Sequence, residues 1–425
     1  MSSQADQLRM RISDLQTEID LQRKLLRKLE DDKILAQRQL NAVLDPVARL
    51  PLEISSEIFL QSLDAPFPEP GALHISMLLL SICSAWTDIA LATPALWVAS
   101  HITFPCALGL KKLLPIRFKR AHNRSLSVSL SGVPFDQDVL SVIWKHGQQL
   151  QHFEMRKGDD GAARGGIWRL WEGCSPGPLP SLQTLAIRGW NSEDYIFSFR
   201  QISELLHMSP NLTECILCDL EIVDDAEAAK ADIVLPKLRR LIFGEPGDLP
   251  FNNVVFNCLS LPGLEVLSTS LPDKEAWDDL LSFLKRSSPP LRELTVKFDG
   301  LGISNLPQYL CLVPDLRRLE VWWPKCHVME GLFAMLAESP SLVPNLDTLV
   351  IHDPEFLSGS FWTALSRTLA ARRTQLHIFR LEVSDPLSAS EMPAPSHIDA
   401  FRELAVGGTR VHIKAYFGLW EHAFY

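Results

Sequence analysis

The chain has 425 residues, of which 46% are apolar and 22% charged, and its formal net charge is -10 at pH 7. This length exceeds what one compact core holds, so we expect two or three structural units or an elongated repeat array. The composition excludes disorder of the whole chain, and the acidic balance argues against a protein that holds nucleic acid through a concentrated basic surface.

The N-terminus, the apolar stretches and the cysteines bear on location. The first residues, MSSQADQLRM, lack the charged-then-apolar order of a signal peptide. The most apolar stretch, Met77 to Val98, is interrupted by Asp88 and Pro94, whereas a membrane span needs about 20 unbroken apolar residues. The eight cysteines do not have the spacing seen in small disulfide-rich domains, which favours a reducing compartment. We therefore expect no membrane partner and a cytoplasmic and/or nuclear location.

Residues 4–43 contain no Gly or Pro and have the a/d spacing of a coiled coil, with alternating intervals of three and four. The apolar seam positions are Leu8, Ile12, Leu15, Ile19, Leu26, Leu29 and Ala36. Gln22 and Lys33 interrupt the seam, which should keep an association weak. The pattern predicts a coiled-coil helix over residues 1–44 that forms a weak homodimer through residues 4–43. The alternative is a single helix that packs on its own chain.

A second region begins at Asp45-Pro46, because Pro disfavours helix in the residue before it and is tolerated in a first turn. Apolar residues with helical spacing lie on both sides of a Pro/Gly-rich break from Ala65 to His74. This predicts a small all-helical module over residues 45–100. Such a short segment cannot bury all its apolar faces alone, so some should be left for a partner's groove or for the segment that follows.

From about residue 120 onward an L-x-x-L-x-L phrase recurs, usually preceded by Pro. It occurs at Leu150-Phe153-Met155, Leu182-Leu185-Ile187, Leu212-Cys215-Leu217, Leu238-Leu241-Phe243, Leu264-Leu267-Thr269, Leu291-Leu294-Val296, Leu316-Leu319-Val321, Leu346-Leu349-Ile351 and Ile378-Leu381-Val383. The first positions are 25 to 32 residues apart, close to the period of leucine-rich repeats, and helical patterns lie between them. The fold class expected for residues 101–425 is an α/β solenoid with a parallel concave sheet and outer helices.

Two features qualify this solenoid. The Asn that usually follows the strand is absent from every phrase, and Pro takes its place in five, so we expect irregular repeats.

Alternation along the strand sends the fourth and sixth positions inward and the third, fifth and seventh to the concave face. That face then carries Arg188, Arg240, Lys297, Arg318, Glu320, Trp322, His352 and Arg380. An exposed Trp beside Arg is a frequent interface anchor, so the candidate target-binding residues are Arg240, Lys297, Arg318 and Trp322; the alternative is a solvated face.

Residues 50–97 resemble the F-box family. Its pattern opens with Leu-Pro-x-Glu-Ile and then Ile-Phe, matched by Leu50, Pro51, Glu53, Ile54, Ile58 and Phe59. It closes with Cys-x-x-Trp-x-x-Ile-Ala and Thr-Pro-x-Leu-Trp, matched by Cys83, Trp86, Ile89, Ala90, Thr93, Pro94, Leu96 and Trp97. The break between the halves is longer and richer in Pro than the usual link. With its coiled-coil start and irregular leucine-rich repeats, the chain is similar to F-box-like proteins that are abundant in fungi.

The resemblance implies docking onto the Skp-type adaptor of a cullin-RING ubiquitin ligase, while the repeats hold an unknown target protein for degradation. The implied adaptor-binding residues are Leu50, Pro51, Glu53, Ile54, Ile58, Phe59 and Trp86. Pro94, Leu96 and Trp97 have the alternative role of joining the module to the repeats. The chain is then a non-catalytic substrate-recognition subunit. The alternatives are a leucine-rich-repeat scaffold unrelated to ubiquitylation, or an unrecognised hydrolase on a repeat frame.

Chemical motifs give no support to the hydrolase. The sequence has no G-x-S-x-G elbow, phosphate loop, dinucleotide fingerprint or H-E-x-x-H. Cys215-x-x-Cys218 has no second pair at zinc-finger spacing, and alternation would send its thiols to opposite sides of a strand. Cys326-His327 are neighbours that would rarely reach one reacting atom together. We expect no enzyme activity, cofactor or metal.

Overall fold

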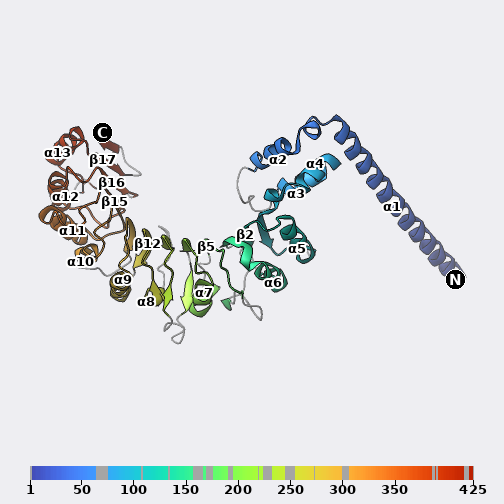
Figure 1. Cartoon of the computed structure of the whole chain (residues 1–425), viewed down its shortest axis with the longest axis horizontal. Helices are drawn as coiled ribbons and strands as arrows, with labels where there is room; N and C mark the ends of the chain where they lie inside the picture. Colours follow the sequence, from blue (N-terminus) through green and yellow to red (C-terminus); the bar gives the residue numbers. More distant parts are fainter. Residues whose placement is uncertain are drawn as a thin grey trace. The chain divides into compact units, whose positions relative to one another are not determined.

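The structure is a computed structural model that describes residues 2–63, 75–106, 109–132, 135–156, 166–168, 176–189, 195–218, 220–223, 232–244, 254–271, 273–298, 306–384, 388, 391–415 and 421–424. It is a mixed α/β protein with a long N-terminal helix and a large parallel sheet (Figure 1). The predicted fold class is confirmed at that level. The chain divides into two compact units, residues 1–101 with 115–126, and residues 102–114 with 127–425.

The helices that the structure describes vary from one turn to the long α1. They are α1 (Ser2–Leu44), α2 (Leu52–Gln61), α3 (Ile75–Ile82), α4 (Ser84–Leu91), α5 (Leu110–Arg120), α6 (Gln137–Lys145), α7 (Phe199–His207), α8 (Val254–Cys258), α9 (Lys274–Ser287), α10 (Leu306–Leu310), α11 (Cys326–Glu338), α12 (Gly359–Ala371) and α13 (Pro395–Val406). Short 3-10 turns are η1 (Val47–Arg49), η2 (Pro94–Trp97) and η3 (Gly147–Gln149). Within these described ranges no helix combines the length and the apolar character needed to cross a membrane.

The large sheet orders its strands along the chain as β1-β2-β3-β5-β7-β10-β12-β13-β14-β15-β16-β17-β18. They are β1 (Ala99–Phe104), β2 (Leu126–Gly132), β3 (Leu150–Arg156), β5 (Thr184–Arg188), β7 (Glu214–Cys218), β10 (Arg240–Phe243), β12 (Val266–Leu271), β13 (Glu293–Phe298), β14 (Arg318–Trp322), β15 (Thr348–His352), β16 (Ile378–Val383), β17 (Arg410–Ala415) and β18 (Glu421–Phe424). One smaller sheet joins β4 (Gly166–Trp168), β6 (Tyr195–Ser198) and β8 (Glu221–Val223). Another joins β9 (Ile233–Val234) with β11 (Leu259–Ser260). From β3 to β17 each pair is parallel, and β18 runs antiparallel to β17.

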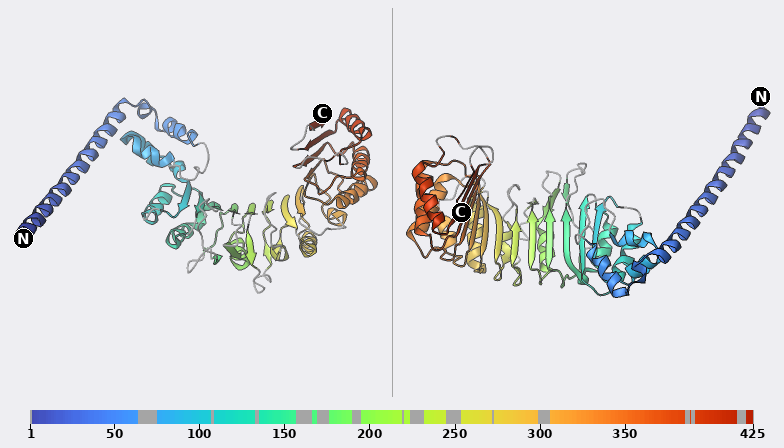
Figure 2. Two further views of the ribbon diagram at one scale, coloured as in Figure 1. Left: turned by 180° about the vertical axis from the view of Figure 1, so that it is seen from behind. Right: turned by 90° about the horizontal axis from the view of Figure 1, so that it is seen from above.

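The strand register explains the recurring phrase. One row crosses the parallel strands through Phe153, Leu185, Cys215, Leu241, Leu267, Leu294, Leu319, Leu349, Phe379 and Val411, which are all between 0% and 2% exposed. Helices such as α7, α9, α11 and α12 lie along one face of this sheet, and we call the other face the open face (Figures 1 and 2). Each strand therefore completes the apolar core of its neighbours, which no single strand and helix could bury alone.

The predicted ninth phrase, Ile378-Leu381-Val383, is two residues out of register. In the structure Phe379 pairs with Leu349, so the phrase runs Leu376-Phe379-Leu381. An aromatic residue at the fourth position hid the true phrase, and aliphatic residues two positions later imitated it. One further parallel strand, β17, continues the row with Val411.

Two arginines tie the ends of neighbouring helices together. Arg372, which follows α12 and is 4% exposed, donates to the carbonyl oxygens of Leu336 (2.7 Å), Ser339 (2.6 Å) and Leu342 (2.9 Å). Arg286, near the end of α9, donates in the same way to carbonyl oxygens in α8 and just after it. The last carbonyl groups of a helix have no partner within that helix, so each arginine satisfies groups that would otherwise be buried without a donor.

In the N-terminal unit α4 packs against α1, α2 and α3. The helical pattern of residues 75–91 is split at Cys83, whose backbone is extended (φ -155°, ψ 171°). The sulfur of this buried residue accepts a hydrogen bond from the backbone N–H of Trp86 at 3.4 Å and so caps α4. Separate α3 and α4 helices can therefore fold back on each other.

Candidate functional site

Helix α2 presents a row of apolar side chains to solvent. Pro51 (φ -53°, ψ 145°) immediately precedes the helix and fixes its start. Leu50, Ile54 and Ile58 are 41%, 51% and 43% exposed. Ile54 and Ile58 are four residues apart and so lie along one side of α2, whereas Leu50 lies in the extended segment just before the helix. Glu53 is exposed in the first turn, where the helix dipole favours a negative charge.

The inner side of α2 is held by its own unit. Phe59 is 1% exposed, and its ring centroid lies 4.9 Å from that of Trp86. The hydroxyl of Ser55 donates to the carbonyl oxygen of Val47 at 3.1 Å. Trp86 is half-buried, and its indole N–H is buried without an acceptor. Phe59, one of the predicted adaptor-binding residues, therefore lies in the interior. It would influence a partner only indirectly, by holding α2 and its exposed apolar residues in place.

Trp97 is a structural residue of the same unit. It is fully buried, and its indole N–H donates to the carbonyl oxygen of Ala90 at 2.8 Å. The guanidinium carbon of Arg120 lies 4.7 Å from the Trp97 ring centroid, a cation–π arrangement. The Thr-Pro-x-Leu-Trp phrase thus fixes the end of the helical module to α5.

Sequence reasoning missed several exposed apolar residues of this unit. They are Leu52, Met77, Leu78 and Leu91, exposed by 47%, 42%, 41% and 37%. The sequence does contain a signal for them, because short helices that are apolar on more than one side cannot bury every side in so small a unit. The unit therefore carries more apolar surface than the motif residues alone indicate.

On the open face of the sheet, an aromatic pair joins β14 to β15. The rings of Trp322 and His352 stack with centroids 3.7 Å apart and planes 11° from parallel. The indole N–H of Trp322 donates to Glu320 Oε1 at 3.0 Å. Trp322 is consequently half-buried and already engaged with its own chain.

Carboxylates surround the imidazole of this pair. His352 Nε2 lies 3.2 Å from Glu320 Oε1, and its Nδ1 lies 3.3 Å from Glu382 Oε2. Arg318 Nη2 lies 2.6 Å from Glu320 Oε2. Burial by itself would raise the pKa of Glu320, but hydrogen bonds from His352, Arg318 and Trp322 lower that pKa to about 2. The group of five side chains, which we call the β14–β16 network, is thus built around an ionised Glu320.

Lys297 and Trp323 flank this network. Lys297 is 6% exposed, and its Nζ lies 4.5 Å from the centroid of the Trp323 ring. Trp323 itself is 36% exposed. Alternation along the strand predicts an inward Trp323, but β14 ends at Trp322 and Trp323 has a left-handed backbone (φ 50°). The change in backbone direction brings the indole over Lys297, and sequence reasoning could not have found it.

The predicted target-binding residues fall into two places. Lys297, Arg318 and Trp322 lie together on β13 and β14, where Lys297 and Trp322 are register partners. Arg240 lies on β10, two strands from β13, and its Nε is 3.2 Å from Glu214 Oε1. Arg240 is therefore separate from the other three.

An apolar cluster lies on the open face near Arg240. It consists of Ala186, Ile216, Cys218 and Ile242, each at most 7% exposed. Cys215, by contrast, belongs to the row that faces the helices, and burial raises the pKa of its thiol. The two cysteines of the C-x-x-C motif thus lie on opposite sides of β7. Among the described residues no group of His, Cys, Asp or Glu side chains is placed to hold a metal ion.

Cys326 of the Cys326-His327 pair contacts Glu330 and Ser358. Cys326 Sγ lies 3.4 Å from both Glu330 Oε1 and Ser358 Oγ. Its thiol pKa is raised, chiefly by burial. A thiolate is the nucleophilic form, so these surroundings keep Cys326 in its less reactive state.

No protein-family model matches this chain, and a comparison with curated proteins finds no match either. Two surfaces of the described residues are therefore the candidates for function. One is the exposed apolar row of α2, and the other is the open face of the sheet from β10 to β16.

Proposed function

We propose that this chain is a substrate-recognition adaptor of a Skp–cullin–F-box type ubiquitin ligase. The observation that carries the proposal is the exposed apolar row of Ile54 and Ile58 on α2, together with the exposed Leu50 just before the helix. These are also the positions at which the sequence resembles the F-box motif. Residues 46–99 would dock on a Skp-type adaptor, and the C-terminal strands would hold a target protein.

The exposed row has the spacing of helix anchors that enter an apolar groove. Completing the burial of each side chain would contribute roughly 1 kcal/mol, since full burial of such a side chain contributes about 1.5–3 kcal/mol. The Phe59–Trp86 contact and the Ser55 hydrogen bond already fix α2 on the inner side. Little conformational entropy would then be lost on docking, which favours a stable complex.

We propose further that the C-terminal unit is an irregular leucine-rich-repeat-like solenoid whose open face is concave and contacts the target. The continuous row of buried residues from Phe153 to Val411 supports this architecture. On the open face, Arg318 and Trp322 form one candidate contact area and Arg240 another, whereas Lys297 is 6% exposed and would support the first area from within. Trp323 joins the first area, because it is the more exposed of the two neighbouring indoles.

In this proposal the chain contributes proximity and the chemistry belongs to other subunits of the ligase. The target is held on one unit while the other docks on the adaptor. No cofactor is needed for either contact.

The decisive experiment is direct binding of the purified full-length chain to a Skp-type adaptor in complex with a cullin N-terminal fragment. Ile54→Asp combined with Ile58→Asp places two charges in the apolar row and should weaken binding at least tenfold. The control is Ile116→Asp in α5, because Ile116 is also an exposed apolar residue, at 49%, outside the row.

Binding by the wild-type chain and by Ile116→Asp, but not by the double variant, would support the adaptor role. If the folded wild-type chain binds no Skp-type adaptor, the proposal is wrong. The alternative would then take its place, a repeat scaffold that assembles proteins without any link to ubiquitylation.

A further inference from the structure

Helix α1 carries an apolar seam that is exposed in the part of the chain that the structure describes. The seam residues Leu8, Ile12, Leu15, Ile19, Leu26 and Leu29 are between 45% and 66% exposed. Leu40 and Val43, which continue the same spacing, are 53% and 69% exposed. A soluble helix normally buries such a stripe, so an occupant is missing.

The contacts of α1 with its own unit use another side of the helix. Arg38 donates to the carbonyl oxygen of Leu80 at 2.5 Å and to the hydroxyl of Thr87 at 2.8 Å. Asn41 donates to the carbonyl oxygen of Ile82 at 3.4 Å. In the heptad frame of the seam, Arg38 and Asn41 occupy outer f and b positions. Helix α1 thus contacts α4 of its own chain through this outer side, while the apolar seam residues stay exposed.

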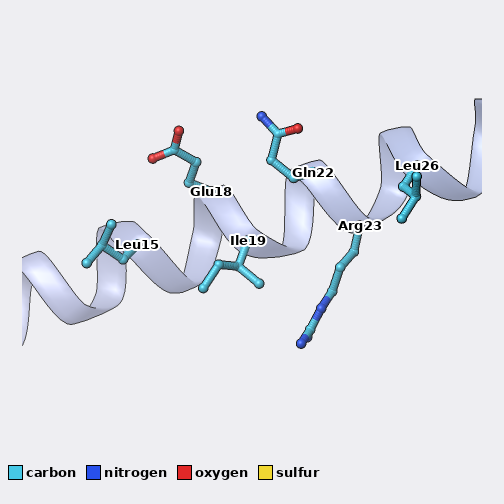
Figure 3. A pocket seen from close by; sticks show the side chains of 6 residues that line it. All are labelled: Leu15, Glu18, Ile19, Gln22, Arg23 and Leu26. Atoms are coloured by element: carbon cyan, nitrogen blue, oxygen red, sulfur yellow. The ribbon is translucent and has the colours of Figure 1, made fainter.

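The seam contains a hollow lined by Leu15, Glu18, Ile19, Gln22, Arg23 and Leu26 (Figure 3). All six residues belong to α1, so the hollow is an open surface of a single helix. In a coiled coil each a or d residue inserts between four residues of the facing helix. Leu15, Glu18, Ile19 and Gln22 form the hole for an a residue, and Ile19, Gln22, Arg23 and Leu26 form the next hole, for a d residue.

We propose that the occupant is a second copy of this chain, paired with α1 in parallel and in register. Ile19 of the second copy would enter the first hole, and its Gln22 the second. The side-chain amides of the two Gln22 residues would then face each other and could share a hydrogen bond. This proposal stands on α1 alone and does not rest on the proposed ligase function.

The charges beside the seam favour the parallel arrangement. In parallel register the g residue of one helix approaches the following e residue of the other. Glu18 therefore meets Arg23 of the second copy, twice by symmetry. The hole that receives Lys33 of the second copy is formed by Leu29, Asp32, Lys33 and Ala36. The two Lys33 residues therefore share one layer, which weakens the association, and Asp32 places a carboxylate beside each ammonium group.

The antiparallel arrangement that overlaps the whole seam is disfavoured by the same residues. It places Glu18 against Asp32 and Arg23 against its own symmetry mate, which are like-charge contacts. It also places Lys33 opposite Leu15, where the ammonium group faces an apolar layer. Like charges at these edge positions select against an arrangement.

The parallel dimer would bring two C-terminal ends of α1 to within about 10 Å, the usual distance between packed helices. Both copies of α2 then belong to one particle. Such a dimer would be bivalent for whatever α2 and the open face bind, and avidity would strengthen each weak contact.

The test uses charge reversal at the flanking pair, with sedimentation equilibrium of the full chain at low salt as the readout. Glu18→Lys and Arg23→Glu each turn two attractive contacts into repulsive ones and should each weaken self-association about tenfold. An equimolar mixture of the two variants should associate as tightly as the wild type, because every g–e contact in the mixed dimer is attractive. The matched control, Lys24→Glu with Asp31→Lys, swaps charges at outer f positions and should leave association unchanged.

Recovery in the mixture, with an unaffected control, is the expected result. A monomeric wild-type chain at high micromolar concentration would overturn the proposal. Tighter association of Glu18→Lys alone would also overturn it, since that result indicates relief of the antiparallel Glu18–Asp32 contact. Equal weakening by the outer-face control would show that the pairing is not specific. None of these outcomes depends on binding to a Skp-type adaptor, which is read out through Ile54 and Ile58.

Discussion

Trp322 stacks on His352 across neighbouring parallel strands, with 3.7 Å between the ring centroids. The two residues are direct register partners of β14 and β15. His352 in turn lies between Glu320 and Glu382, so the stack connects three consecutive strands. The aromatic residue that the sequence marks as a surface anchor is therefore also part of what holds the open face together.

Replacing Trp322 by Ala should destabilise the chain by about 1–3 kcal/mol. The stack contributes roughly 0.5–1.5 kcal/mol, and Glu320 loses a hydrogen bond while half-buried. Denaturant unfolding measures the change. Trp322→Phe is the matched variant: it retains an aromatic face for His352 but no N–H, so its stability should lie between the wild type and Trp322→Ala. Equal stability of wild type and Trp322→Ala would refute the network.

Glu320 should make stability depend on pH in the acid range. Its pKa is lowered to about 2 in the folded chain from an ordinary value of 4.5. A lowered carboxyl pKa stabilises the fold fully above the unfolded value, and this contribution, about 3 kcal/mol, is lost as pH falls from about 5 towards 2. The unfolding free energies of wild type and Glu320→Gln should therefore differ near neutral pH and converge near pH 2. Glu355→Gln controls for loss of one exposed charge, and a difference independent of pH would contradict the assignment.

Phe59 and Ile54 are expected to behave in opposite ways, although both belong to the F-box-like motif. Phe59→Ala leaves a cavity beside Trp86 and should destabilise the N-terminal unit by about 3–5 kcal/mol. Ile54→Ala removes an exposed side chain and should change stability by no more than about 0.5 kcal/mol. Thermal unfolding followed by tryptophan fluorescence compares them. A large loss for Ile54→Ala would show that its side chain is buried in solution and unavailable to a partner.

Arg372 should be among the most sensitive charged positions of the C-terminal unit. Arg372→Met keeps much of the side-chain volume but leaves three carbonyl oxygens without their donor, at roughly 2–4 kcal/mol. Its exposed neighbour gives a matched control, since Arg373→Met removes the same charge one residue away. Urea unfolding of both variants measures the difference. Equal unfolding free energies for the two variants would mean that water satisfies the three carbonyl oxygens as well as Arg372 does.

The helices and most strands could be predicted because periodicity reports which side of an element is buried. The L-x-x-L-x-L phrase works in this way, since Leu319 and Leu349 occupy one row. The phrase did not identify the strand at Phe379, because it requires an aliphatic residue at a position that an aromatic residue fills equally well in the core. The β14–β16 network could not be predicted, because strand pairing brings together residues about 30 positions apart. The orientation of Trp323 could not be predicted either, because it depends on one backbone angle that no sequence pattern encodes.

The antiparallel strand β18 has a consequence for solubility. A parallel sheet that ended at β17 would offer a row of free N–H and C=O groups to strands of other chains. Residues 421–424 pair with that row and, being a short strand, present little new edge of their own. Removing residues 416–425 should therefore leave the interior packing of the sheet intact but convert its C-terminal end into a template for strand addition, so that aggregation rather than unfolding becomes the first visible defect.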